Sequence, residues 1–148
     1  MSEIVLENLQ EAFMLDNNGK LDAIYELCDM LESYEYKSNN MEDLNKILDF
    51  LLGHLESESD NQLVEQMTEA IVLAFIYQKV TTFDYSKVVK LLENLNGNAL
   101  ANMIEILGYS KQLKYLTVLE QYKTNENKLV KEAALLSIKQ IKNDELNL

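Results

Sequence analysis

One short phrase occurs three times in the chain, as Asn61-Gln62-Leu63-Val64, Asn98-Ala99-Leu100-Ala101 and Asn127-Lys128-Leu129-Val130. Each copy opens a segment whose apolar residues recur with the period of an α-helix. Asn is a favourable N-cap because its side-chain oxygen accepts a hydrogen bond from a free amide of the first turn. The phrase therefore predicts three starts of one helical packing unit, each capped by its Asn. Units repeated at such spacing stack on their neighbours and offer an extended surface for binding.

The apolar periodicity of the whole chain predicts about eight helices and no strand. The expected ranges are about 2–15, 20–34, 41–55, 61–79, 84–95, 98–107, 111–122 and 127–142. Residues 70–77 are apolar on nearly all sides, which indicates that their helix is the most buried. With 148 residues, 47% of them hydrophobic, the chain is long enough for one substantial core. We therefore expect a single all-α repeat domain spanning residues 1–148.

The charge of the chain is negative and unevenly distributed. The formal net charge is −12, and all 13 basic residues are Lys. Residues 1–78 hold 17 Asp and Glu against three Lys, whereas residues 79–148 hold eight acids and ten Lys. An acidic surface repels nucleic acid and anionic lipid and attracts cationic proteins, and Arg, the usual bidentate phosphate binder, is absent. The sequence thus predicts a cationic protein partner for the first half, with charge that only aids solubility as the alternative.

Two acidic triplets and two tyrosines are the candidate partner-binding residues. The triplets fall on strips of the second and third predicted helices, and the tyrosines bracket Glu35; the residues are Asp22, Glu26, Asp29, Glu42, Asp49, Glu56, Tyr34 and Tyr36. Like charges at this spacing destabilise a helix by about 0.2–0.5 kcal/mol per pair. Tyrosine is a frequent anchor of protein interfaces. We interpret the set as an acidic surface for a cationic partner; solvated helix faces and tyrosines that seal a helix end are the alternatives.

Residues suited to catalysis or metal binding are few. His54 is the only histidine, has no Cys or Ser partner identifiable beside it, and is expected to be a surface or boundary residue. Cys28, the only cysteine, lies on a predicted apolar face, where it is expected to pack as a small hydrophobic residue. Neither provides a nucleophile–base pair or the clustered ligands of a zinc site. We expect no enzymatic activity, cofactor, metal or small-molecule substrate.

The sequence also bears on localisation. No run approaches the roughly 18 apolar residues that span a membrane. The start Met1-Ser2-Glu3-Ile4 lacks the basic region of a secretory signal, and a lone cysteine agrees with a reducing compartment. We therefore expect a cytoplasmic protein that binds neither membrane nor nucleic acid.

Residues 103–142 resemble the short HEAT-like repeats. In that family a helix closes on Leu-Gly, and a later helix carries a Val, two further residues and Ala-Ala. Ile106-Leu107-Gly108 looks like such a closure, and Val130-Lys131-Glu132-Ala133-Ala134 looks like the second pattern, while residues 41–75 match more loosely. The usual Asp and Pro of the turn and the Arg after the Val are replaced by Asn, Lys128 and Lys131. The resemblance implies helix pairs stacked as a right-handed superhelix.

The size, acidity and degenerate HEAT-like helices of the chain also look like those of the bacterial immunity proteins that neutralise contact-delivered toxins. That resemblance implies an inhibitor whose acidic helical face covers the cationic active-site surface of a toxin such as a nuclease. A nuclease must be cationic where it holds its substrate, so an acidic inhibitor competes there directly. The alternative is a non-catalytic HEAT-like adaptor that binds another protein.

Overall fold

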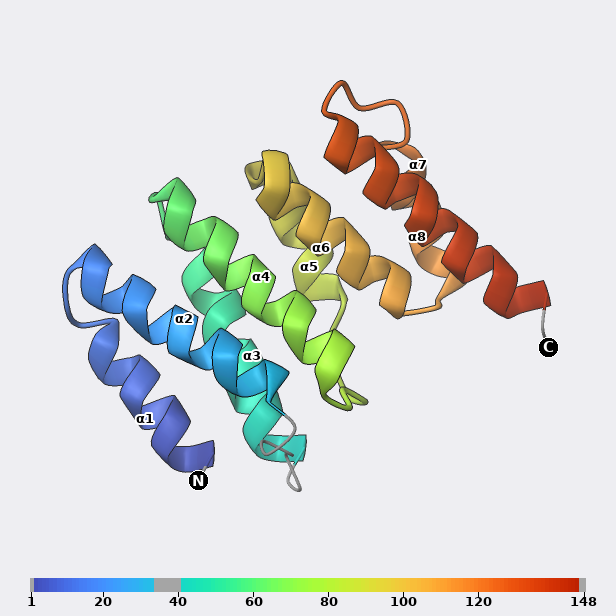
Figure 1. Ribbon diagram of the computed structural model, residues 1–148. Coiled ribbons are helices and arrows are strands. Elements are labelled where there is room, and N and C mark those ends of the chain that lie inside the picture. The colour runs from blue at the N-terminus through green and yellow to red at the C-terminus, as the bar shows by residue number, and fades with distance from the viewer. Residues whose placement is uncertain (1, 34–40, 147–148) are drawn as a thin grey trace. The chain divides into compact units, whose positions relative to one another are not determined.

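The computed structural model describes residues 2–33 and 41–146, with side chains over 5–33 and 43–143. All regular secondary structure in these ranges is helical, and no strand occurs in them, so the predicted all-α fold is confirmed (Figure 1). None of the described helices combines the length and apolar content needed to cross a bilayer. The chain divides into two compact units, residues 1–83 and 84–148. The expectation of one domain over the whole chain stays a prediction.

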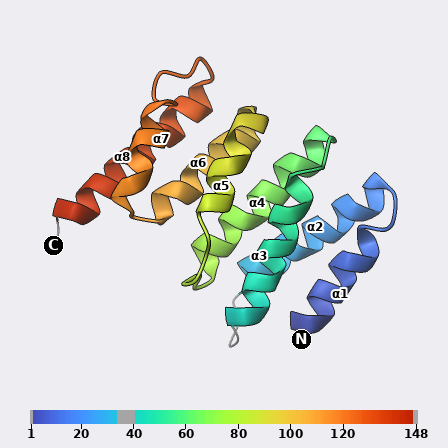
Figure 2. The ribbon, with the colours of Figure 1, turned by 180° about the vertical axis from the view of Figure 1, so that it is seen from behind.

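Unit 1 contains four long helices. They are α1 (Ser2–Ala12), α2 (Asn17–Glu32), α3 (Met41–Leu55) and α4 (Asn61–Tyr77). Helices α1 and α4 each pack against both α2 and α3. Helices α2 and α4 run in the same direction, whereas α1 and α3 run the opposite way (Figure 1). The reverse view shows α3 in front of α2 and α4, so α2 and α4 form one layer and α3 lies in a second layer on one side of it (Figure 2).

The core of unit 1 is centred on α4. The apolar run predicted to be buried over 70–77 is buried over 70–74, whereas Ile76 and Tyr77 at its end are 50% and 55% exposed. Leu63, Met67 and Ile71 lie at intervals of four residues on α4 and are at most 1% exposed. The two small residues Ala70 and Ala74 are also fully buried, so neighbouring helices approach α4 closely. Burial of a Leu, Met or Ile side chain contributes about 1.5–3 kcal/mol each. This burial fixes α2 and α3 against α4 and leaves their polar residues on the outside.

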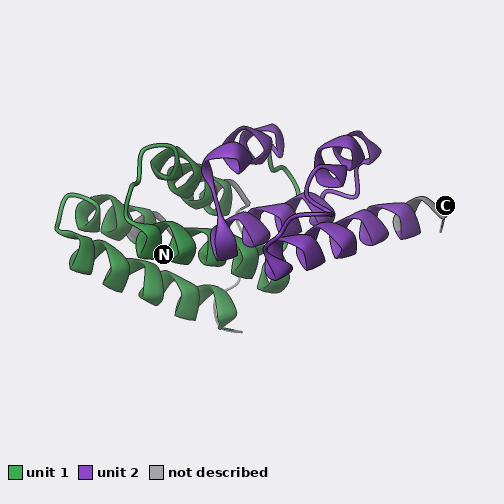
Figure 3. Cartoon of the chain, turned by 90° about the horizontal axis from the view of Figure 1, so that it is seen from above, with its two compact units in different colours: residues 1–83 green, residues 84–148 purple. Residues whose placement is uncertain are grey.

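Unit 2, purple in Figure 3, combines two long helices with shorter segments. Its elements are α5 (Ser86–Leu91), the 3-10 turn η1 (Leu92–Asn94), α6 (Gly97–Tyr109), the 3-10 turn η2 (Leu113–Tyr115), α7 (Leu116–Glu120) and α8 (Lys128–Leu146). Helix α6 packs along α8, while α5 packs on α6 and α7 on α8. The ranges predicted as continuous helices over 84–95 and 111–122 are therefore each a short α-helix joined to a 3-10 turn.

Small side chains line the contact between α6 and α8. Ala134 is fully buried, and the hydroxyl of Ser137, which is 3% exposed, donates a hydrogen bond of 3.1 Å to the carbonyl oxygen of Ile104. That bond satisfies the only polar group of Ser137 in an apolar setting, where an unpaired hydroxyl would cost about 1–3 kcal/mol.

The predicted Asn cap is correct at the third copy of the repeated phrase. The side-chain oxygen of Asn127 accepts hydrogen bonds from the backbone amides of Leu129 at 2.9 Å and Val130 at 3.2 Å. Both amides belong to the first turn of α8, where no backbone partner exists for them. Asn127 therefore fixes the start of this helix.

The other two predicted caps are wrong. At the first copy the N-cap is Asp60, whose carboxylate accepts from the amide of Leu63 at 3.0 Å, and Asn61 is the first residue of α4. The charged carboxylate is the stronger acceptor for a helix N-terminus, so the helix starts one residue later than its Asp. At the second copy α6 begins at Gly97, after Asn96, and Asn98 lies within its first turn.

Candidate protein-binding surface

The predicted acidic strip of α2 lies at the surface. Asp22, Glu26 and Asp29 are all exposed. They occupy the face opposite Ile24, Leu27 and Leu31, which are at most 2% exposed in the core. The exposed Tyr25 and Glu32 lie on the same side of the helix. Helix α2 therefore presents a strip of four carboxylates and one tyrosine ring, which we call the α2 strip.

A carboxylate of α4 acts on the buried side of α2. The pKa of the Cys28 thiol is raised from 9.0 to about 12, chiefly by burial and then by the charges of Glu69, Glu32 and Asp29, in that order. Glu69 belongs to α4, which packs along α2. Sequence reasoning did not include Glu69, because a contact between helices cannot be read from the spacing within one of them.

Helix α1 packs against α2 beside the α2 strip. A small cleft of about 40 Å³ lies between the two helices, and Glu26 forms part of its lining together with Val5, Asn8 and Met30. Glu26 is thus both exposed and adjacent to apolar surface. A carboxylate in this setting suits a long basic side chain, whose aliphatic stem needs apolar contact and whose head needs a counter-charge.

The second predicted triplet does not continue the α2 strip. Asp49 is exposed on α3, Glu56 is exposed in the turn that follows the end of α3 at Leu55, and the side chain of Glu42 lies outside the described residues. Helix α3 lies in the other layer of unit 1 from α2 (Figures 1 and 2). The two triplets therefore belong to different layers. Tyr34 and Tyr36 lie outside the described residues.

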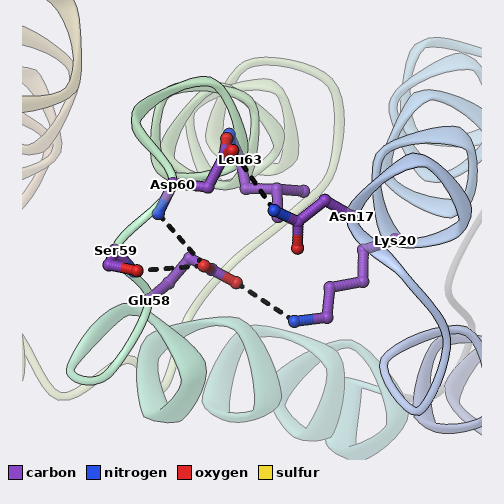
Figure 4. A network of polar contacts seen from close by, with 6 residues as sticks. All are labelled: Asn17, Lys20, Glu58, Ser59, Asp60 and Leu63. Atoms are coloured by element: carbon purple, nitrogen blue, oxygen red, sulfur yellow. Dashed lines mark hydrogen bonds and ion pairs between the residues drawn. The ribbon is translucent and has the colours of Figure 1, made fainter.

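Some acidic residues of unit 1 hold the fold together. The Glu58 carboxylate accepts hydrogen bonds from the amides of Ser59 and Asp60, both at 3.1 Å, and pairs with the Lys20 ammonium at 3.4 Å (Figure 4). Asp60 caps α4 and also accepts from the side-chain amide of Asn17 at 3.3 Å. This network joins the start of α2 to the turn between α3 and α4. Glu58 and Asp60 are thus structural, unlike the carboxylates of the α2 strip.

His54 is partly buried, as expected of a boundary residue, but it has ring partners that the sequence did not indicate. Its ring centroid lies 4.7 Å from that of Phe13 and 4.4 Å from that of Phe50. The two Phe rings meet edge to face at 5.1 Å. The spacing of Phe50 and His54 by four residues could have indicated that these two rings meet on one face of α3. Phe13 follows α1, so its contact with them could not be read from that spacing. We call these three side chains the aromatic cluster.

The described residues contain no group of three or more His, Cys, Asp or Glu side chains placed to hold a metal ion. Comparison of the chain with protein-family models, curated proteins and solved structures gives no match.

Proposed function

We propose that the chain is a cytoplasmic, non-catalytic inhibitor of the immunity type, which neutralises a basic toxin domain such as a nuclease by covering its cationic active-site surface. The observation that carries the proposal is the α2 strip. Asp22, Glu26 and Asp29 project from a helix whose opposite face is fixed in the core. Exposed charges on a rigid helix accelerate encounter with an oppositely charged partner and set its orientation.

Charge distribution supports the same proposal. Unit 1 holds 17 of the 25 acidic residues, and the few that make structural contacts, such as Glu58 and Asp60, leave a large excess. Solubility requires net charge but not its concentration in one part of the chain. A nuclease holds nucleic acid on a cationic surface, so the acidic face competes with substrate for the same charges.

The finer architecture that we propose is a HEAT-like repeat array. Within unit 1 the parallel helices α2 and α4 pack side by side, and within unit 2 α6 and α8 do the same. Parallel packing of alternate helices is what stacked helix pairs produce. The buried small residues between α6 and α8 further support this interpretation.

A non-catalytic adaptor is the second candidate, and the leucines of α8 favour it. Leu129, Leu135 and Leu136 are between 46% and 66% exposed on one helix. Exposed apolar side chains gathered on one element are typical of protein-binding surfaces. An adaptor would bind its partner through α8 and would leave the α2 strip free.

Capture of the partner by the tagged chain from its native cell, followed by assay of that partner, tests the proposal. We expect a basic protein whose nucleic-acid cleavage stops at one equivalent of the chain. Replacement of Asp22, Glu26 and Asp29 by Lys should relieve the inhibition. An acidic partner, or a partner whose activity is unchanged by the chain, would contradict the proposal.

A further inference from the structure

The aromatic cluster lines an open cleft where α1 ends against α3. Phe13 directly follows α1, while Phe50 and His54 lie one turn apart on α3, and all three rings are partly exposed. The cleft has a volume of about 380 Å³. The cluster therefore presents aromatic surface to solvent at one defined place in unit 1.

The remaining lining of this cleft includes two carboxylates. It consists of Glu7, Gln10 and Glu11 of α1 and of Met14 in the turn that follows. Glu7 and Glu11 are exposed one turn apart on α1. No lysine belongs to the described lining. The three rings of the aromatic cluster thus line the same cleft as two carboxylates of α1.

This combination is chemically selective for an organic cation with a flat, weakly hydrated head. Aromatic faces attract cations within about 6 Å of the ring centroid, and Arg does so more often than Lys because the guanidinium also stacks. Carboxylates accept paired hydrogen bonds from the guanidinium fork. The exposed thioether of Met14 is polarizable and flexible, so it adapts to the stem of the incoming side chain.

A lysine of the chain already lies at the edge of the cluster. The Lys20 ammonium is 5.7 Å from the centroid of the Phe13 ring and 3.4 Å from the Glu58 carboxylate. Its charge is therefore balanced by Glu58 outside the cleft. Phe13 thus already has a cation of the protein itself at the edge of the cluster.

We propose that this cleft binds an arginine side chain of the cationic partner, with the guanidinium over the aromatic cluster and its N–H groups donating to Glu7 and Glu11. The inference rests on the proposed function, which supplies a basic protein as the source of the arginine. It adds a defined anchoring point to the long-range attraction of the α2 strip. The compact, strongly hydrated ammonium of lysine fits this site less well.

The test uses His54 as a reporter, since it is the only histidine and its ring signals in an NMR spectrum are unique. The full chain is titrated with N-acetyl-arginine amide, with the neutral N-acetyl-citrulline amide, and with N-acetyl-lysine amide. We expect saturable shifts of the His54 ring signals with the arginine compound at a Kd on the order of 1–10 mM. The citrulline compound should bind at least about tenfold more weakly, and the lysine compound should also bind more weakly than the arginine compound. Equal binding of citrulline, or no saturable shift with arginine up to about 50 mM, would overturn the proposal.

Variants locate the site. Replacement of both Glu7 and Glu11 by Gln should weaken arginine binding about fivefold or more, because it removes the counter-charge and keeps the shape. The matched control replaces Glu93 and Glu126 of unit 2 by Gln and should leave the Kd unchanged. Phe50→Leu should also weaken arginine binding, because it removes one aromatic face of the cluster. If circular dichroism shows that this variant does not fold, the glutamate pair decides the outcome.

The two proposals fail in distinguishable ways. A partner that is not basic contradicts the proposed function even if the cleft binds N-acetyl-arginine amide. A basic partner that binds the Glu7→Gln, Glu11→Gln variant as tightly as the original chain contradicts the cleft assignment and leaves the α2 strip in place.

Discussion

Gly108 of α6 and Ser137 of α8 are in direct contact. A Cβ atom at residue 108 would lie 2.7 Å from the Ser137 hydroxyl oxygen and 3.0 Å from the Ser137 Cα atom. Side-chain carbons do not approach other atoms so closely, and a backbone Cα atom cannot give way as the end of a flexible side chain can. The separation of α6 and α8 at this point therefore depends on the absence of a side chain at residue 108.

Gly108→Ala should lower the free energy of unfolding by about 1–3 kcal/mol, since one extra methyl forces the two helices apart. Urea unfolding followed by circular dichroism measures the change. The matched control is Gly53→Ala in α3, where an added Cβ would meet no atom within 4 Å. That substitution should raise stability by about 0.5–1 kcal/mol through the higher helix propensity of Ala. If Gly108→Ala raised the free energy of unfolding as Gly53→Ala does, the packing of α6 on α8 would be contradicted.

Ala134→Leu should destabilise unit 2 by about 1–3 kcal/mol, because Ala134 is fully buried against neighbouring helices. Ala133→Leu should cost clearly less, since Ala133 is only partly buried. Thermal unfolding of the two variants gives the comparison. A larger loss for Ala133→Leu would show that the register of α8 is different.

Asp60→Ala should lower the free energy of unfolding by about 1–2 kcal/mol, because the carboxylate caps α4 and also holds Asn17. Asn61→Ala removes an exposed side chain from the first turn and should change stability by less than about 0.5 kcal/mol. Chemical unfolding of both variants checks which residue is the cap. The reverse order would restore Asn61 as the cap.

The Cys28 thiol should react slowly with a disulfide reagent at pH 8 in the native protein and much faster in urea. Only the thiolate reacts, and the native pKa is about 12. A raised pKa means that folding favours the neutral thiol, so this contribution to stability is complete below pH 9 and is lost as the pH rises from 9 towards 12. Glu69→Gln should lower the native pKa and speed the reaction, whereas Glu126→Gln should not. A native rate equal to the unfolded rate would contradict the burial of Cys28.

Helical periodicity predicted most of the buried faces, although Ile76 and Tyr77 at the end of α4 are exposed. The apolar residues of α4 and the alternation of Ile24 and Leu27 with Asp22 and Glu26 are local patterns, and a local pattern determines which side of a helix can enter a core. The exposed α2 strip follows from the same rule. These predictions required no knowledge of which helix packs on which.

Details that depend on neighbouring chain segments were not predicted. The repeated phrase marked helix starts to within a residue or two, but Asp60 precedes Asn61 and is the stronger cap, and Gly97 begins its helix before Asn98. The aromatic cluster joins Phe13, which follows α1, to Phe50 and His54 of α3, and Glu69 of α4 acts on the Cys28 thiol of α2. Such contacts arise from tertiary packing, which the spacing within one helix does not encode.

The association rate of the partner captured by the chain tests the central claim most directly. The measurement compares the original chain with two variants, one carrying Lys at Asp22, Glu26 and Asp29, the other carrying Glu at the four exposed lysines of α8, which are Lys128, Lys131, Lys139 and Lys142. Steering by exposed charge predicts that the first variant associates at least about tenfold more slowly, with the difference largest at low salt, and that the second changes little. Loss of binding in the second variant with full binding in the first would contradict the account and assign the partner to α8.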